Sequence, residues 1–362
     1  MCHYAHAHII IMTKWKEGSV PLFCFAFMLF LLVLSIWSNS SAWNKPAYLR
    51  ITSTHPNGVS LKNFLSWLFS GTSGNGIYEE KISSSNLTIV TAYWNIGTFR
   101  KGSSGLYTKN TYFSWTKSFQ YLMNPLVVYT DSKEFGDLMK KLRSEGKLNY
   151  QTEIFYGERK SFWPFGLVDR IQGVYKQPGY PAHHPNTVNA LYAAAQHAKF
   201  TVIADAARKN IYNTPYYAWL DVGYFRDLVG SEQFFELKIP DDQDPGRISV
   251  NLIFRRHMKI NPHEIFRHNI VWVGGGMFIG TKNIFIKFEE LYHKALLYFL
   301  DQHLMNSDQQ VLFAMYSNQG RKALKPKIEL QLYTPTGNGN PWFYLGYLCR
   351  EIVNRTNMIE FI

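Results

Sequence analysis

Cysteine is scarce in this sequence, which has only Cys2, Cys24 and Cys349 among its 362 residues. The first two lie before or inside an apolar N-terminal segment, so only Cys349 belongs to the body of the chain. Three cysteines in these positions exclude a disulfide framework. We expect Cys349 to form no disulfide bond within the chain.

Several sequence motifs for nucleotide binding and catalysis are also missing. The sequence has no P-loop ending in G-K-[ST], no G-x-G-x-x-G dinucleotide motif, no G-x-S-x-G nucleophile motif and no kinase motif set. Its 12 histidines show neither an H-E-x-x-H nor an H-x3-H spacing. These absences argue against P-loop, hydrolase, kinase and zinc-site chemistry.

What the sequence does have is a large apolar content and an excess of positive charge. Apolar residues make up 46% of it, aromatic residues 16% and charged residues 18%, which indicates a globular core rather than disorder. The 38 Lys and Arg outnumber 26 Asp and Glu, and the net charge of +12 suits anionic partners. The cations are scattered, and their longest cluster, residues 255–259, is short, so we expect no nucleic-acid binding.

The N-terminal part of the chain contains one long uncharged segment. No charged residue lies between positions 18 and 44, and residues 20–37 are apolar at almost every position. A helix of that length spans about 27 Å, close to the thickness of bilayer hydrocarbon. Because Lys14 and Lys16 precede the segment, the positive-inside rule keeps the N-terminus in the cytoplasm.

These features predict a single-pass type II membrane protein of the secretory pathway. We expect a cytoplasmic tail at 1–18, a transmembrane signal anchor at 19–37, a stem rich in Ser, Gly, Asn and Thr at 38–85, and a luminal domain at 86–362. The alternative is a cleaved signal peptide, because Ser40, Ser41 and Ala42 are small residues placed like a cleavage site. The body would then be secreted.

Short apolar strands alternate with amphipathic helices in the body of the chain. The patterns predict strands at 87–93, 125–130, 152–156, 216–220, 248–254 and 270–282, and helices at 110–122, 132–143, 188–208, 283–304 and 311–316. This alternation predicts an α/β fold with a mostly parallel sheet flanked by helices.

Asp221 lies in the most informative stretch of the sequence, YYAWLDVGYFR at residues 216–226. Five largely apolar residues lead into this lone carboxylate, and Gly223 follows. The pattern is typical of a buried strand that delivers an acid to the carboxyl edge of a sheet, where open α/β sheets bind ligands. The alternative is that Asp221 caps a turn.

Two later segments are further candidates for binding. Gly274, Gly275 and Gly276 interrupt a predicted strand, and they either let a ligand approach the backbone or form a bulge. Ser307 or Asp308 is a natural N-cap of the helix that follows. Asp308 is therefore either a helix cap or a functional carboxylate.

A literal Asp-x-Asp sequence occurs elsewhere, at Asp242 and Asp244. Pro240 and Pro245 bound it, which indicates a solvated loop rather than the end of a buried strand. We therefore rank Asp221 above this pair as a candidate for ligand binding.

Four motifs in order resemble those of the HtrL/YibB family: TIVTAYWNIG from residue 88, the 216–226 stretch, VWVGGGMFIGT from residue 271 and SDQQVLF from residue 307. The similarity covers residues 87–333. That family is similar to glycosyltransferases of the GT-A type. The resemblance implies a GT-A-like α/β domain that binds a nucleotide sugar as donor and a glycan as acceptor.

The same resemblance bears on a metal site. GT-A enzymes place an Asp-x-Asp after a buried strand, where the carboxylates hold a divalent cation on the diphosphate of the donor. Here Asp221, Val222 and Gly223 take that position, and the second carboxylate is missing. A single carboxylate makes only a minimal site for Mg²⁺ or Mn²⁺, so metal dependence stays open, with Asp221 as the candidate ligand.

The remaining candidates complete the expected site. Asp221 would orient the donor, Arg226 would neutralise phosphate, and Asp308 would bind acceptor hydroxyls or act as a base. Further donor contacts are expected at Gly223, Gly274, Gly275 and Gly276.

These expectations leave a choice of function. The first hypothesis is a hexosyltransferase-like glycosyltransferase, with the Golgi as its expected compartment. The alternative is a membrane-tethered carbohydrate-binding or interaction protein that keeps the fold without transfer activity, which the missing second Asp favours. A secreted basic protein without a ligand is a third interpretation, and it requires the α/β prediction to be wrong.

Overall fold

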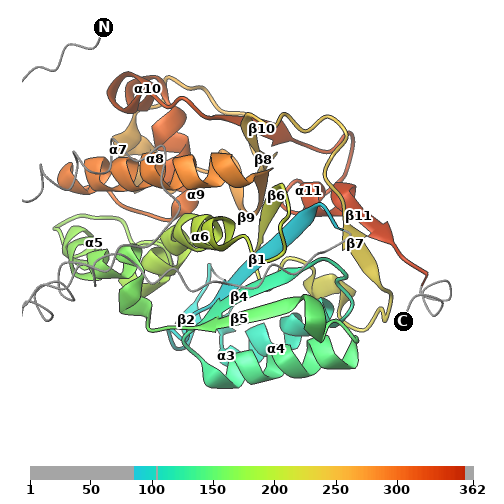
Figure 1. The fold of residues 1–362 in the computed structure, drawn as a ribbon. Coiled ribbons are helices and arrows are strands. Elements are labelled where there is room, and N and C mark those ends of the chain that lie inside the picture. The colour runs from blue at the N-terminus through green and yellow to red at the C-terminus, as the bar shows by residue number, and fades with distance from the viewer. Residues whose placement is uncertain (1–84, 103–104, 355–362) are drawn as a thin grey trace, which may run out of the picture. The chain divides into compact units, whose positions relative to one another are not determined.

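The computed structural model describes residues 85–102 and 105–354 (Figure 1). The expected tail, membrane anchor and stem lie outside the described residues, apart from residue 85. No helix in the described part of the chain is long and apolar enough to span a membrane. All described residues belong to one compact unit, Gly76–Ile362.

Seven strands form the central sheet of this unit. They are β1 (Leu87–Tyr93), β4 (Leu126–Thr130), β5 (Thr152–Tyr156), β6 (Tyr216–Leu220), β8 (Arg247–Leu252), β9 (Val273–Thr281) and β10 (Glu329–Tyr333). Their order across the sheet is β10-β8-β9-β6-β1-β4-β5. Only β9 runs against the others, antiparallel to both β6 and β8. The predicted mixed α/β fold with a mainly parallel sheet is confirmed.

Apolar side chains cover both faces of this sheet. All five residues of β4 and nearly all of β1 are buried, and such continuous apolar strands need a cover on each side. Successive residues of β1 point to opposite faces, so Val90 joins one apolar cluster and Ile89 joins the other. The sheet therefore separates two cores.

Helices supply the cover on each face (Figure 1). One core takes in α6 (Ala190–Lys209), α8 (Lys282–Asp301) and α9 (Asp308–Tyr316), and the other takes in α4 (Lys133–Glu145) and α11 (Tyr344–Cys349). The other described elements are α3 (Lys109–Trp115), α5 (Val168–Tyr175), α7 (Pro262–Arg267), α10 (Asn318–Leu324), and the short pairs β2 (Phe99–Arg100) with β3 (Leu106–Tyr107) and β7 (Phe235–Leu237) with β11 (Arg350–Ile352).

Helix α6 is the helix that most affects the site. Fourteen of its 20 residues are buried, as expected of a helix that is apolar almost all round. The Asn189 side chain accepts a hydrogen bond from the Tyr192 N–H at its start, and Asn210 ends it in the left-handed conformation. Lys199 lies in its middle, with only 3% of its side chain exposed.

The order of the strands creates a switch point beside β1. The chain adds β4 and β5 on one side of β1 and then returns to place β6 on the other side. Ligands of open α/β sheets bind at the carboxyl ends of the strands where the order reverses in this way. Because β9 is antiparallel and pairs Met277 with Leu220, its first residues reach the same edge.

Several predicted boundaries differ from the structure. The helix predicted at 110–122 stops at Trp115 and continues as a 3-10 turn at Thr116–Gln120. The Thr116 hydroxyl donates to the Tyr112 carbonyl, a contact that often bends helices. The helix predicted to reach residue 304 ends at Asp301, and His303 has a φ of 58°. The three glycines do not interrupt their strand, since they lie inside β9 near its beginning.

Cys349 is the last residue of α11 and packs in the core on the α4 side of the sheet. Burial raises the pKa of its thiol to about 12. Because Cys2 and Cys24 lie outside the described residues, the absence of a disulfide at Cys349 stays a prediction.

Candidate functional site

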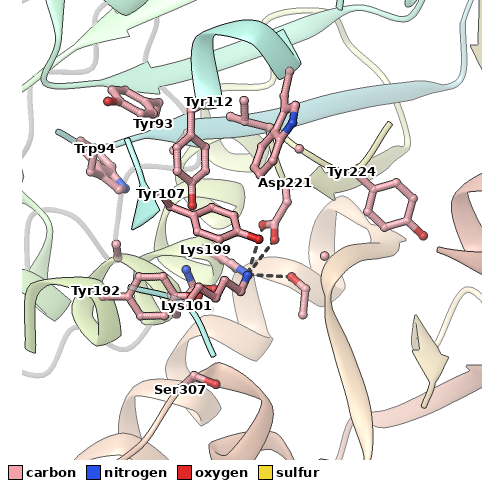
Figure 2. Close-up of a pocket in the computed structure, with 18 of the residues that line it drawn as sticks. Tyr93, Trp94, Lys101, Tyr107, Tyr112, Tyr192, Lys199, Asp221, Tyr224 and Ser307 are labelled. Atoms are coloured by element: carbon pink, nitrogen blue, oxygen red, sulfur yellow. Dashed lines mark hydrogen bonds and ion pairs between the residues drawn. The ribbon is translucent and has the colours of Figure 1, made fainter. Parts of the chain in front are cut away.

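A cavity of about 550 Å³ opens at the carboxyl edge of the sheet. Its wall comes from the ends of β1 and β6, the β2–β3 hairpin, α3, the middle of α6, the start of β9, the start of α9 and residues 340–343. Segments far apart in the sequence thus meet at the switch point (Figure 2).

Three charged side chains meet in the wall of this cavity. The Lys199 ammonium lies 3.1 Å from Asp221 Oδ1 (Figure 2). It also lies 3.1 Å from Asp308 Oδ2. It also donates a 2.7 Å hydrogen bond to the Gly275 carbonyl. An ammonium has three N–H donors, so these three partners account for all of them. Lys199, Asp221 and Asp308 are called the charge cluster below.

Asp221 is the member of the charge cluster that faces the cavity. It follows β6 directly, and its backbone N–H donates to the Gly276 carbonyl at 2.9 Å. Its Oδ1 accepts a 2.7 Å hydrogen bond from the Trp219 indole, and 40% of its side chain is exposed. The carboxylate therefore bonds to Trp219 and Lys199 and remains accessible to a ligand, as the strand pattern predicted.

Asp308 is enclosed, in contrast to Asp221. It is the first residue of α9, Ser307 is the N-cap, and only 2% of the Asp308 side chain is exposed. Burial raises the pKa of Asp308, and Lys199 acts in the opposite direction. Its observed partner is the ammonium, so we expect it to act through Lys199.

The protonation of Lys199 follows from the same contacts. Burial by itself would lower the pKa of Lys199, but Asp221 and Asp308 outweigh that effect and raise the pKa above its ordinary value. The two carboxylates therefore favour the charged form of Lys199 inside a mostly apolar helix.

The glycines predicted to contact a ligand make room for side chains of the protein itself. A Cβ at position 275 would lie 2.4 Å from Asp308 Oδ2, and one at 276 would lie 3.0 Å from the Tyr224 ring. Gly274 lies against Ile253 and is not part of the cavity wall.

The structure supports the bulge alternative for the glycine run, and the approach of a ligand to it stays a prediction. Gly275 and Gly276 do line the cavity. The pairing of β8 with β9 also shifts register between Val250 and Leu252, as the bulge alternative expects.

Gly223, on the other side of the cavity, also makes room for a side chain of the protein itself. A Cβ there would lie 2.4 Å from the Trp115 ring, so glycine lets this indole pack on the turn after Asp221. The Arg226 guanidinium lies 5.5 Å from the centre of the Trp115 ring and 4.7 Å from that of Phe343, and it donates to the Gly223 carbonyl. The rings hold this exposed cation at the cavity wall.

Lys101 adds a further cation from the β2–β3 hairpin. The residue as a whole is exposed, yet its amine lies within the cavity wall, 5.7 Å from the centre of the Tyr107 ring. Desolvation of the amine lowers the pKa of Lys101; Asp221 and Asp308 oppose this, and Lys199 and Arg226 add to it. Counted formally, the four cations that line the cavity, Lys101, Lys109, Lys199 and Arg226, and its two carboxylates give the site a net charge of +2.

Aromatic rings make up much of the remaining wall. Figure 2 shows Tyr93, Tyr107 and Tyr112 gathered on one side of the charge cluster. Among the residues that the structure describes, the rings in the wall are those of Tyr93, Trp94, Phe99, Tyr107, Tyr112, Trp115, Tyr192, Trp219, Tyr224, Trp342 and Phe343. Such rings offer flat faces on which a base or a sugar can stack.

Sequence reasoning missed Lys199 and most of these rings. The signal for Lys199 was present, because lysine is almost never buried without a partner and this one stands in an alanine-rich helix predicted to be buried. Its partners are 22 and 109 positions away, and no local pattern connects them.

The oxygen donors of the charge cluster are taken up by the Lys199 ammonium, so the cluster has no open place for a divalent cation. Within the residues that the structure describes, no three His, Cys, Asp or Glu side chains are grouped as metal ligands. The carboxylates of Asp221 and Asp308 instead share the Lys199 ammonium. A divalent ion there would face a fixed positive charge and have one accessible carboxylate.

The literal Asp-x-Asp lies away from this cavity. Asp242 accepts a 2.7 Å hydrogen bond from the Tyr333 hydroxyl, and Asp244 pairs with Arg247 at 2.9 Å. Their loop leads into the start of β8, and its Pro245 carbonyl bonds to Thr281 at the far end of β9. This is the amino edge of the sheet, opposite the cavity.

The fold and the site together define a mixed α/β protein with a cationic, aromatic-lined cavity at its switch point. Comparison with protein families matches residues 85–323 to the family described as "Bacterial protein of unknown function (HtrL_YibB)". The match covers more than half of the chain, and the chain belongs to the HtrL/YibB family. A comparison with curated proteins found no match.

Proposed function

We propose that the protein is a glycosyltransferase with a GT-A-like fold, which transfers a sugar from a nucleotide-sugar donor to a glycan or glycoconjugate acceptor. The observation that carries this proposal is Asp221, a cavity-facing carboxylate that directly follows β6 at the switch point of the sheet. Nucleotide ligands of open α/β sheets bind at such points.

The size and charge of the cavity support a donor of this kind. A volume of about 550 Å³ falls within the range of small-molecule sites. Lys101 and Arg226 offer positive charge for a diphosphate, and the rings of Tyr107, Tyr112 and Trp115 offer stacking surfaces for a base or a sugar.

The chemistry of transfer assigns a role to each group. The bond between the anomeric carbon and the diphosphate oxygen breaks, and its electron pair leaves with the diphosphate. An acceptor hydroxyl forms the new bond and loses its proton. Lys101 and Arg226 stabilise the charge on the departing diphosphate. Asp221 binds sugar hydroxyls or, in an inverting transfer, takes the proton of the acceptor.

The proposed location follows from the N-terminal segment. Residues 19–37 would anchor the protein as a single-pass type II membrane protein of the secretory pathway, in the Golgi, with the catalytic domain in the lumen. Cleavage near Ala42 would instead release the domain as a secreted protein.

One observation favours a second candidate function. Asp308 has 2% of its side chain exposed, which leaves Asp221 as the only carboxylate of the charge cluster open to a ligand. A membrane-tethered carbohydrate-binding or interaction protein needs no second acid. This candidate keeps the ligand site and omits the transfer.

The test is a donor panel on the purified full-length protein in detergent. We expect one class of nucleotide sugar to stabilise the protein against heat, and the same donor to release its nucleoside phosphate when a glycan acceptor is added. Binding of free glycans with no release would favour the second candidate. Failure of every nucleotide sugar to bind would overturn the glycosyltransferase proposal.

A further inference from the structure

The position where the GT-A resemblance expects a divalent cation already holds a cation of the protein. The Lys199 ammonium contacts three oxygen atoms: Asp221 Oδ1 at 3.1 Å, Asp308 Oδ2 at 3.1 Å and the Gly275 carbonyl at 2.7 Å. Two of these belong to carboxylates, and all three are hard donors of the kind that Mg²⁺ or Mn²⁺ would take.

The packing around Lys199 fixes the ammonium in that place. The side chain comes from the middle of buried helix α6, and 3% of it is exposed. Gly275 has no Cβ to displace the Asp308 carboxylate, which a Cβ would approach to 2.4 Å. Helix α6, strand β9 and the start of α9 therefore all pack around this one ammonium.

A second cation has no comparable place beside Asp221. Its Oδ1 already accepts from Trp219 at 2.7 Å and lies beside the ammonium, and its Oδ2 lies 3.5 Å from the same ammonium. A divalent ion on Oδ2 would be close to a fixed charge of the same sign, and the other carboxylate of the charge cluster, Asp308, is enclosed and already paired with that ammonium.

We propose that this site binds the diphosphate of its ligand without a divalent cation, because Lys199 fills the metal position and the side chains of Lys101 and Arg226 neutralise the phosphates. This inference rests on the proposed function, since that function supplies the diphosphate. Arg226 is held at the cavity wall by Trp115 and Phe343 and carries a planar guanidinium that can bind phosphate oxygens in pairs. Asp221 is then left to contact the sugar.

The first experiment measures the binding of UDP, GDP and inorganic pyrophosphate to the full-length protein by calorimetry, once in EDTA and once in Mn²⁺. We expect at least one nucleoside diphosphate to bind with dissociation constants that agree within about threefold between the two solutions. Binding that becomes tenfold or more tighter with Mn²⁺ would overturn the inference and leave the proposed function intact. No binding in either solution would instead overturn the proposed function.

A second experiment does not depend on any nucleotide. Mn²⁺ is titrated into the protein alone and followed by its electron paramagnetic resonance signal, with wild type, Lys199→Ala and Lys209→Ala compared. Lys209 is a matched control because it lies on the same helix and pairs with Asp205 away from the cavity. We expect only Lys199→Ala, which leaves two carboxylates without their ammonium, to bind Mn²⁺ and to gain thermal stability from it.

Mn²⁺ binding to wild type that disappears in Asp221→Asn would contradict the inference directly. Lys199→Ala could fail to fold both with and without Mn²⁺. The wild-type titration then tests the inference by itself, because the inference requires that wild type bind no Mn²⁺ through Asp221.

Discussion

The two edges of the central sheet carry similar carboxylates in different surroundings. At the carboxyl edge, Asp221 and Asp308 share a buried ammonium beside a cavity. At the amino edge, Asp242 and Asp244 bond to Tyr333 and Arg247 in an exposed loop. The literal Asp-x-Asp is at the amino edge and the candidate site is at the other. Whether a carboxylate can contact a ligand therefore depends on the end of the strand at which it lies, and not on a match to the Asp-x-Asp sequence.

The largest effect is expected when the buried ammonium is removed. Lys199→Met keeps an apolar stem and leaves Asp308, which is 2% exposed, without its ion partner. Breaking a buried pair from one side costs about 3–5 kcal/mol. Urea unfolding of the variant should show a loss of that size.

The control for this variant removes both charges. In Lys199→Met/Asp308→Asn neither an ammonium nor a carboxylate is left buried and unpaired, so most of the lost stability should return. A double variant as unstable as the single one would mean that packing, and not charge, explains the effect.

Asp221→Asn should have the next largest effect, on ligand binding or transfer. It keeps the size of the side chain and removes the charge that faces the cavity. Loss of one such preorganised contact costs about 2–4 kcal/mol. That corresponds to roughly thirtyfold to a thousandfold in affinity or rate, measured with the donor found in the panel.

The amino edge provides the matched controls for Asp221→Asn. Asp242→Asn and Asp244→Asn should change affinity and rate by less than about twofold, because neither side chain lines the cavity. Equal losses of affinity and rate in all three variants would mean that the carboxyl and amino edges of the sheet do not differ in ligand binding. Unchanged binding in Asp221→Asn would make Asp308 the next residue to test.

Gly275→Ala should have a smaller, structural effect. The added Cβ would lie 2.4 Å from Asp308 Oδ2, and overpacking of this kind costs about 1–3 kcal/mol. Gly173→Ala is the control, because a Cβ there meets nothing within 4 Å and alanine favours the surrounding helix α5. Thermal unfolding should show a lower midpoint for the first variant and an equal or higher one for the second.

The smallest effect is expected at an ion pair of the amino edge. Glu329, at the start of β10, accepts two hydrogen bonds from Arg321, and both side chains are about 40% exposed. Solvent screening keeps the loss in Glu329→Gln below about 1 kcal/mol at neutral pH.

The pH dependence of this pair has a definite sign. The Arg321 hydrogen bond lowers the pKa of Glu329 below its ordinary value of 4.5. The stabilisation is therefore complete above pH 4.5 and is lost as the pH falls through the lowered pKa. Urea unfolding should therefore show equal stability for wild type and Glu329→Gln in acid. A difference in stability that persists at low pH would mean that the charge of Glu329 does not cause it.

Much of the fold could be predicted from local sequence. The strand predicted at 87–93 matches β1, because a nearly continuous apolar run of this length is typical of a buried strand. The strand predicted at 152–156 matches β5, which is only partly buried and is rich in β-branched and aromatic residues. The position of Asp221 at the end of β6 followed from the same kind of run. The two-residue strands β2 and β3 were missed, since they are too short to show any periodicity.

The interior of the site could be predicted only in part. Asp221, Gly223, Arg226, Gly275, Gly276 and Asp308 do line one cavity. The enclosure of Asp308 and the role of Lys199 depend on contacts across the sheet, and single-sequence patterns carry no information on such pairs. For the same reason, the sequence did not indicate that Gly275 and Gly276 make room for Asp308 and Tyr224; their contact with a ligand stays a prediction.

The residues of the charge cluster lie far apart in the sequence, and this separation affects how the chain folds while it is being synthesised. Lys199 and Asp308 are 109 positions apart, so a growing chain completes α6 long before its second carboxylate partner has been synthesised. Until α9 docks, the ammonium cannot settle into the apolar interior with both of its carboxylates. Burial of α6 must therefore wait for the C-terminal part. A chain truncated before residue 308 should remain open to proteases, and completion of the site should coincide with completion of the fold.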